Sequence, residues 1–117
     1  MARMQYTNLN YLNEITGGEA EMTKEFILMF LDQMVEFKDG MTSFLAEKKW
    51  KELGEMAHKA KSSVMTFGMN DLGHELKELQ LKTQKQEDIA SYPRYVTNFI
   101  FLMGIAEIEL KDVMSKL

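Results

Sequence analysis

The sequence predicts an all-α protein, and we expect an antiparallel up-down four-helix bundle with a short N-terminal capping helix. Apolar residues recur at spacings of three and four in four separate runs, which places each run on one face of a helix. Only one proline and seven glycines interrupt the 117 residues, and both residue types break helices. Four helices that each have one apolar face bury those faces by packing against one another.

The first run belongs to a long helix that starts after the glycine pair at 17–18 and continues through Gly40. Its apolar positions are Ile27, Phe30, Met34, Phe37, Met41 and Phe44. The segment before the glycines, residues 8–15, is short and amphipathic, and we expect it to cap one end of the bundle. Its apolar positions are Leu9, Leu12 and Ile15.

The second long helix is expected to start at Trp50, after the polar residues 47–49. Its apolar positions are Leu53, Ala57, Ala60, Val64 and Phe67. Gly68 ends this helix, and Asn70 or Asp71 is the expected N-cap of the third helix. The apolar positions of the third helix are Met69, Leu72, Leu76 and Leu79.

A polar stretch, residues 82–91, separates the third helix from the fourth, for which Ser91 and Pro93 are a start signal. The apolar positions of the fourth helix are Val96, Phe99, Met103, Ala106, Leu110, Val113 and Leu117. The eleven methionines suit irregular space in the core. The chain has the length of one domain, and we expect a single domain spanning residues 1–117.

The composition excludes several classes of function. The absence of cysteine removes disulfides, thiolate metal sites and cysteine nucleophiles. A formal charge of −4 argues against a general nucleic-acid binder. No apolar run approaches the roughly 18 residues of a membrane span, and residues 1–10 lack the apolar centre of a secretory signal. We therefore expect a cytoplasmic protein that binds neither nucleic acid nor membrane, and the initial methionine favours a free-standing chain.

His58 is the first candidate for chemistry. At about 100° per residue it lies roughly 150° from the centre of its helix's apolar stripe, so it is expected to face solvent. Lys61 lies one turn further on and can reach the space above the imidazole. An imidazole with one unprotonated nitrogen is a good nucleophile, and an ammonium stabilises phosphoryl oxygens. The pair can therefore hold a phosphoryl group, although an exposed histidine can also be an ordinary surface residue. Small Ser62 and apolar Met65 share its side, which indicates a docking surface.

The other histidine, His74, also points away from its apolar stripe. Glu75 and Glu78 lie beside it, and two carboxylates would repel a phosphoryl group. We interpret His74 as an ordinary surface residue.

The stretch AHKAKSSVMTFGM at 57–69, followed by Leu72, resembles the signature of the histidine-containing phosphotransfer (HPt) domain. That signature reads roughly A-H-x-L-K-G-S-x-x-x-hydrophobic-G-small, then a leucine. Gly-Gly-Glu at 17–19 resembles the family's G-G-D/E opening before its first long helix. The resemblance covers nearly the whole chain in length, helix number and motif position. The departures are Ala60 for the usual leucine, Ser62 for the usual glycine and Met69 for the usual small residue.

The resemblance implies a four-helix bundle that carries a phosphoryl group on an exposed histidine between aspartates of response-regulator receiver domains. It implies His58 as the phosphoacceptor and Lys61 as the phosphate-stabilising cation. Gly68 would end the motif helix and allow close approach to the next one. The chain would be a phosphocarrier without kinase activity, and no nucleotide-binding loop is visible. The implied partners are receiver domains and a sensor or hybrid histidine kinase, with Mg²⁺ held by the receiver and no cofactor or metal held here.

The docking hypothesis concerns the outward side of the second long helix. We expect Met65 and nearby residues of the first long helix to receive an apolar patch of a receiver domain. Lys59 and Lys61 would meet acidic groups around the receiver's phosphorylation pocket, and Ser62 would lie at the contact. The protein is expected to be a monomer.

Two other classes of function are open. Glu55-x-x-His58 and Asp71-x-x-His74 match the paired E-x-x-H pattern of di-iron bundles, whose ligands must project into the core. These residues point away from their stripes, so a metal-binding bundle is disfavoured. The second class is a helical interaction module that docks a partner without transferring a phosphoryl group, and the histidine with its lysine argues against it.

Overall fold

The computed structural model describes residues 6–117, and these residues form helices without a β-strand, which confirms the all-α class. The elements are α1 (Asn10–Thr16), α2 (Ala20–Ala46), α3 (Trp50–Thr66), α4 (Asn70–Lys85), the short 3-10 helix η1 (Ile89–Ser91) and α5 (Tyr92–Ser115). The predicted lack of a secretory signal in residues 1–10 concerns in part residues 1–5, which lie outside the described range. None of the helices over residues 6–117 is both long and apolar enough to cross a membrane.

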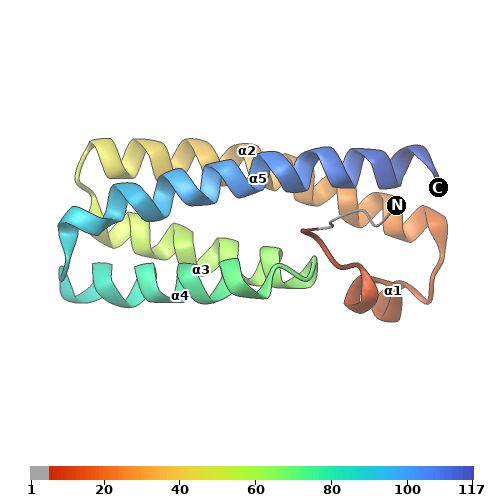
Figure 1. The fold of residues 1–117 in the computed structure, drawn as a ribbon, viewed down its shortest axis with the longest axis horizontal. Coiled ribbons are helices and arrows are strands. Elements are labelled where there is room, and N and C mark those ends of the chain that lie inside the picture. The colour runs from red at the N-terminus through yellow and green to blue at the C-terminus, as the bar shows by residue number, and fades with distance from the viewer. Residues whose placement is uncertain (1–5) are drawn as a thin grey trace.

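Figure 1 shows α2, α3, α4 and α5 lying lengthwise, with α3 running opposite to α2, α4 opposite to α3, and α5 opposite to α4. The most extensive contact joins α3 and α4, while α2 packs against α3 and α5, and α5 also packs against α4. The long helices differ in length: α2 and α5 have 27 and 24 residues, whereas α3 and α4 have 17 and 16. The short helix α1 packs against α2 near the end that α3 and α4 leave uncovered (Figure 1).

The predicted apolar stripes form the core. Every predicted position in α3, α4 and the turn between them is buried, and in α2 only Phe44 is half-buried. Across the core the rings of Phe30 and Phe67 stack with their centroids 4.4 Å apart. The α5 stripe is buried from Val96 to Leu110. Leu117 is 45% exposed, so its predicted burial is wrong, because it follows the last residue of α5.

The predicted capping segment is α1, but its inward face differs from the prediction. Leu12 is fully buried and Leu9 is half-buried, whereas Ile15 is 43% exposed and was wrongly assigned to the core. Thr16 is buried instead, and its hydroxyl bonds to the Thr23 hydroxyl of α2 at 3.2 Å. The buried face is centred between positions 12 and 16, which leaves position 15 about 80° away.

The helix boundaries agree with the sequence at Trp50, where α3 begins, and at Gly40, through which α2 runs unbroken. The predicted N-cap of α4 is wrong. Met69 occupies that position, no side chain caps the helix, and Asn70 is its first residue. The chain reverses at Gly68, with φ at 78°, and the next residue, the N-cap, is the buried Met69.

Gly68 follows the end of α3, as predicted, but it makes room for a different neighbour. The N-terminal strap, residues 6–9, crosses this turn, and Asn8 N donates to Phe67 O at 2.9 Å. The atoms that a side chain at Gly68 would meet first belong to Asn8. The positive φ and this close approach both require glycine.

The strap is held from the other side by Glu109 of α5. Its carboxylate accepts hydrogen bonds from Tyr6 N at 2.7 Å, from Thr7 N at 2.8 Å and from the Thr7 hydroxyl at 2.7 Å. The strap therefore connects the α3–α4 turn to α5, three segments that are far apart in the sequence.

Candidate functional site

His58 lies near the middle of α3 on its exposed face, as the helical geometry predicted. The flanking positions Ala57 and Ala60 are fully buried. One face of α3 therefore belongs to the core while the face that bears the imidazole is open to water.

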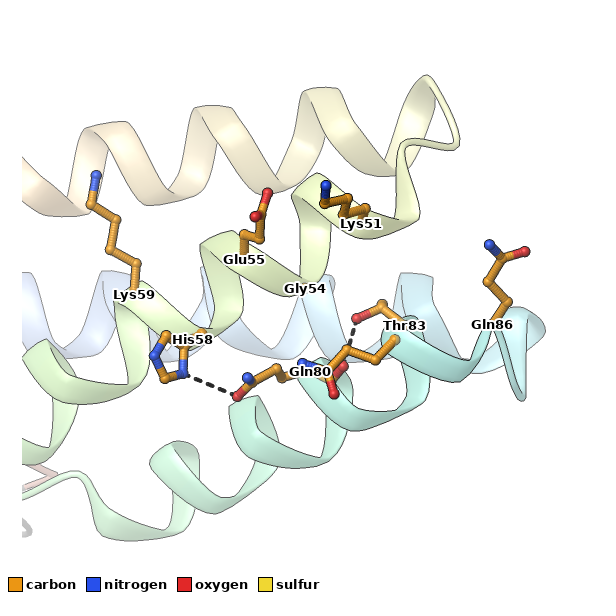
Figure 2. A pocket seen from close by; sticks show the side chains of 9 residues that line it. Lys51, Gly54, Glu55, His58, Lys59, Gln80, Thr83 and Gln86 are labelled. Atoms are coloured by element: carbon orange, nitrogen blue, oxygen red, sulfur yellow. Dashed lines mark hydrogen bonds between the residues drawn. The ribbon is translucent and has the colours of Figure 1, made fainter.

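Gln80 of α4 is the hydrogen-bond partner of the imidazole. His58 Nδ1 and Gln80 Oε1 are 3.2 Å apart (Figure 2). An amide oxygen only accepts hydrogen bonds, so this contact favours the neutral tautomer with its proton on Nδ1. The lone pair is then on Nε2, the nitrogen that Gln80 does not contact. The arrangement leaves one ring nitrogen as a free nucleophile.

The imidazole stands at a groove of about 680 Å³ between the N-terminal half of α3 and the C-terminal half of α4. Figure 2 shows Gln80 and Thr83 on the α4 side and Lys51, Glu55 and Lys59 on the α3 side. The lining residues are Lys51, Gly54, Glu55, His58, Lys59, Gln80, Thr83, Gln84 and Gln86. Amides and charged groups of both signs thus line the groove beside the ring.

Lys59, a predicted docking residue, points from α3 toward α2, where its ammonium lies 3.0 Å from the carboxylate of Glu36 (Figure 2). Both side chains are more than half exposed. Exposed ion pairs of this kind contribute about 0–1 kcal/mol. A negatively charged partner can therefore compete with Glu36 for Lys59 at little cost.

Lys61, the predicted phosphate-stabilising cation, is half-buried on α3. It follows His58 by three residues and lies about 60° from it around the helix, on the side away from Lys59 and toward α4. Within residues 6–117 it forms no ion pair. Ser62 is exposed on the same side of α3 as His58. The two lysines thus flank the imidazole on opposite sides.

Met65 differs from its predicted outward position. Its side chain is half-buried and packs against the core, lying over Gly73 of α4. The absence of a side chain at Gly73 creates the recess that it occupies. Only part of Met65 is available to a partner, and it lines a small hollow beside Asn8 and Tyr11.

His74 is exposed on α4, as predicted. The carboxylate of Glu75 is bonded to Asn98 Nδ2 of α5 at 2.8 Å, while Glu78 is exposed. His74 has no partner comparable to Gln80 among the described residues, because no hydrogen bond of its ring occurs there.

The residues of the metal-bundle alternative do not form an interior ligand set. Glu55, His58, Asp71 and His74 are all exposed, whereas that alternative requires ligands in the core. Over residues 6–117, no group of three or more His, Cys, Asp or Glu side chains is placed to hold a metal ion.

Sequence reasoning missed Gln80. Nothing in the sequence distinguishes it from the other glutamines of this region, because its role depends on which residue of α4 lies opposite His58. That register is set by the packing of two helices and not by a local pattern.

The fold and the exposed histidine define a helical protein with a solvent-facing imidazole held by a neighbouring helix. A family model described as the Hpt domain matches residues 25–117, which is most of the chain, and the protein belongs to the Hpt domain family. The resemblance seen in the sequence is thereby confirmed. No curated protein and no solved structure matches the chain.

Membership in this family implies a role in histidine phosphotransfer within the phosphorelays of two-component signalling. Hpt domains are phosphocarriers rather than kinases, and they interact with response-regulator receivers and kinases.

Proposed function

We propose that this protein is a phosphorelay intermediate in which His58 accepts a phosphoryl group from a receiver-domain aspartate, or from a hybrid kinase, and passes it to another receiver. The observation that carries the proposal is the exposed imidazole whose Nδ1 is bonded to Gln80, which leaves Nε2 for attack. The scaffold is proposed to be one antiparallel up-down four-helix bundle, with its short N-terminal capping helix, over residues 1–117. We further propose that it acts as a cytoplasmic monomer.

The transfer is an exchange of one bond to phosphorus for another. The Nε2 lone pair attacks the phosphorus of an aspartyl phosphate, the N–P bond forms, and the P–O bond to the aspartate breaks to leave a carboxylate. The ring keeps its Nδ1 proton and carries a positive charge. The Gln80 oxygen accepts from that nitrogen at 3.2 Å and favours the charged ring, because hydrogen bonds to charged groups are stronger than neutral ones. The second transfer reverses these steps with a new aspartate.

The cations beside the ring would neutralise the phosphoryl oxygens. Lys61 is half-buried and has no ion pair among the described residues, so its charge is available to the phosphoryl group. Lys59 can leave its exposed pair with Glu36 for the same purpose or for acidic groups of the receiver. We propose that Mg²⁺ is held by the receiver and that this chain contributes no cofactor.

The proposed docking surface surrounds His58 on the outward side of α3. It includes Lys59, exposed Ser62 and the accessible part of Met65. The α2 residue Met29 is 59% exposed and lies two turns before Glu36, so it adds apolar area to the same side of α2.

The test is phosphoryl transfer from a phosphorylated receiver domain. The wild-type protein is expected to acquire an acid-labile, base-stable phosphate, and His58→Gln should abolish it, because glutamine lacks a nucleophilic ring nitrogen. The matched control is His74→Gln, which removes the other exposed histidine and should label normally. Loss of labelling in the control instead would overturn the assignment. Binding of the receiver without labelling of the wild-type protein would support an interaction module.

A further inference from the structure

The imidazole lies on the seam between the two helices that pack most extensively, and this seam is narrowed at two glycines. Gly54 of α3 and Gly73 of α4 are both buried. A Cβ atom at Gly54 would collide with the Thr83 hydroxyl of α4. At Gly73 it would lie 2.7 Å from Cγ and 2.8 Å from Cε of Met65. Each helix therefore contributes one notch that the other helix fills.

The two notches and the imidazole contact belong to one antiparallel register. Gly54 of α3 lies against Thr83 of α4. Four residues later in α3, His58 contacts Gln80, which is three residues earlier in α4 than Thr83. Seven residues after His58 in α3, Met65 lies against Gly73, which is seven residues earlier in α4 than Gln80. The contact between His58 and Gln80 is thus flanked on both sides by a close approach that a glycine permits.

We propose that Gly54 and Gly73 are positioning residues for the transfer site, because the close approach at these two notches brings Gln80 within hydrogen-bond distance of His58 Nδ1. This inference rests on the proposed function for its consequence but not for its geometry. A helix pair separated further by a methyl group at either notch would leave Gln80 short of the ring. The ring would then lose the partner that holds its proton on Nδ1.

The two positions should differ in severity. The methyl of Gly54→Ala meets Thr83, whose hydroxyl is itself bonded to Gln80 O at 2.8 Å and whose β-branched side chain is stiff. The methyl of Gly73→Ala meets the flexible side chain of Met65, which can swing away. We expect Gly54→Ala to have the larger effect and Gly73→Ala to be the variant that folds most readily.

The experiment is ¹⁵N NMR of the histidine side chains at about pH 9, where imidazoles are neutral. The position of the proton separates the two ring-nitrogen signals, and Gln80→Leu provides the reference for a ring without its acceptor. Gly54→Ala and Gly73→Ala should move the His58 signals toward those of Gln80→Leu and leave those of His74 unchanged. Gly104→Ala is the matched control, because a Cβ there has no heavy-atom neighbour within 4 Å, and its spectrum should equal that of the wild type.

A second variant separates positioning from general damage. Gly54→Ala combined with Thr83→Ala removes the hydroxyl that the new methyl meets, and it should return the His58 signals toward wild type. Phosphotransfer by Gly54→Ala should slow by roughly fivefold, the change expected for one ordinary hydrogen bond. Wild-type ring signals in both folded glycine variants would overturn the inference. Failure of wild-type labelling would instead overturn the proposed function, since the NMR result does not require phosphoryl transfer.

Discussion

At the scale of single residues, the site depends on which nitrogen of His58 carries the proton. Gln80 favours the proton on Nδ1, because its oxygen lies 3.2 Å from that nitrogen. His74 is also exposed but has no such acceptor among the described residues. The difference between the two histidines therefore lies in their neighbours and not in their burial.

Tyr6 gives a prediction about pH at the same scale. Its hydroxyl is buried without a hydrogen-bond partner among the described residues. Burial, together with the nearby carboxylates of Glu75, Asp71 and Glu109, raises the pKa of Tyr6 from 10.0 to about 12. The folded protein keeps this proton to a higher pH than the unfolded chain does. The resulting stabilisation is complete below pH 10 and is lost as the pH rises toward about 12.

Tyr6→Phe should remove this dependence, because phenylalanine cannot ionise and leaves no polar group buried. We expect urea unfolding at about pH 8 to give the variant a free energy of unfolding equal to or above that of wild type. Above about pH 10 the wild type should lose stability faster than the variant. Burial also raises the pKa of Tyr92, so the difference between the two proteins is the informative quantity. Parallel alkaline profiles would contradict the prediction.

At the scale of elements, a segment outside the helices joins parts of the chain that are distant in sequence. The strap at residues 6–9 links the α3–α4 turn to α5 through Asn8 and Glu109. A carboxylate has the capacity to accept all three strap hydrogen bonds at once. The strap also encloses Gly68, which explains why that position has no room for a side chain.

Glu109→Gln should loosen the strap, since an amide has one acceptor oxygen and presents a donor group to the strap's own donors. We expect a loss of about 1–3 kcal/mol in the free energy of unfolding and faster hydrogen exchange at the amides of Tyr6 and Thr7. Glu107→Gln is the control, because Glu107 pairs with exposed Lys111 on the same helix. It should cost no more than about 0.5 kcal/mol. Equal effects of the two substitutions would show that the strap contributes nothing.

At the scale of the whole molecule, the core and the site occupy opposite faces of the same helix. The buried stripe of α3 packs against the other long helices, while His58 and its groove face water. Changes at the exposed residues of the site, such as His58, should therefore alter transfer without altering stability. This separation is the expected consequence of a one-sided amphipathic helix in a bundle.

Leu79→Ala provides the contrast, because Leu79 is fully buried and precedes Gln80 in α4. Removing its side chain should lower the free energy of unfolding by about 2–5 kcal/mol through lost burial and a residual cavity. His58→Gln should change it by no more than about 0.5 kcal/mol, as exposed substitutions usually do. Chemical denaturation of both variants checks the pair, and comparable losses would mean that His58 is part of the packing.

Much of the fold was predictable because the spacing of apolar residues and the signals that start or end a helix are local features of the sequence. The stripes marked the buried faces of the long helices, and Trp50 marked the start of α3. The misses were at ends, where periodicity has too few residues to define a face. Ile15 was assigned inward in a helix of seven residues, and Leu117 was assigned to a stripe that had already ended.

In the candidate site, too, local features were predictable and contacts with another helix were not. The exposure of His58 followed from its angle to a stripe on its own helix, and the signature around it indicated the Hpt family. Met65 was predicted to be more exposed than it is, because the recess that receives it is made by Gly73 on another helix.

The sequence by itself determined the helices, the buried faces of the four long ones and the exposed histidine, since these depend on residues within one or two turns of each other. Only the tertiary structure decided that Gln80 would meet Nδ1, that Gly68 would face the strap and that Lys59 would pair with Glu36. These contacts depend on the register and separation of packed helices, which is the summed result of many side-chain contacts along the core.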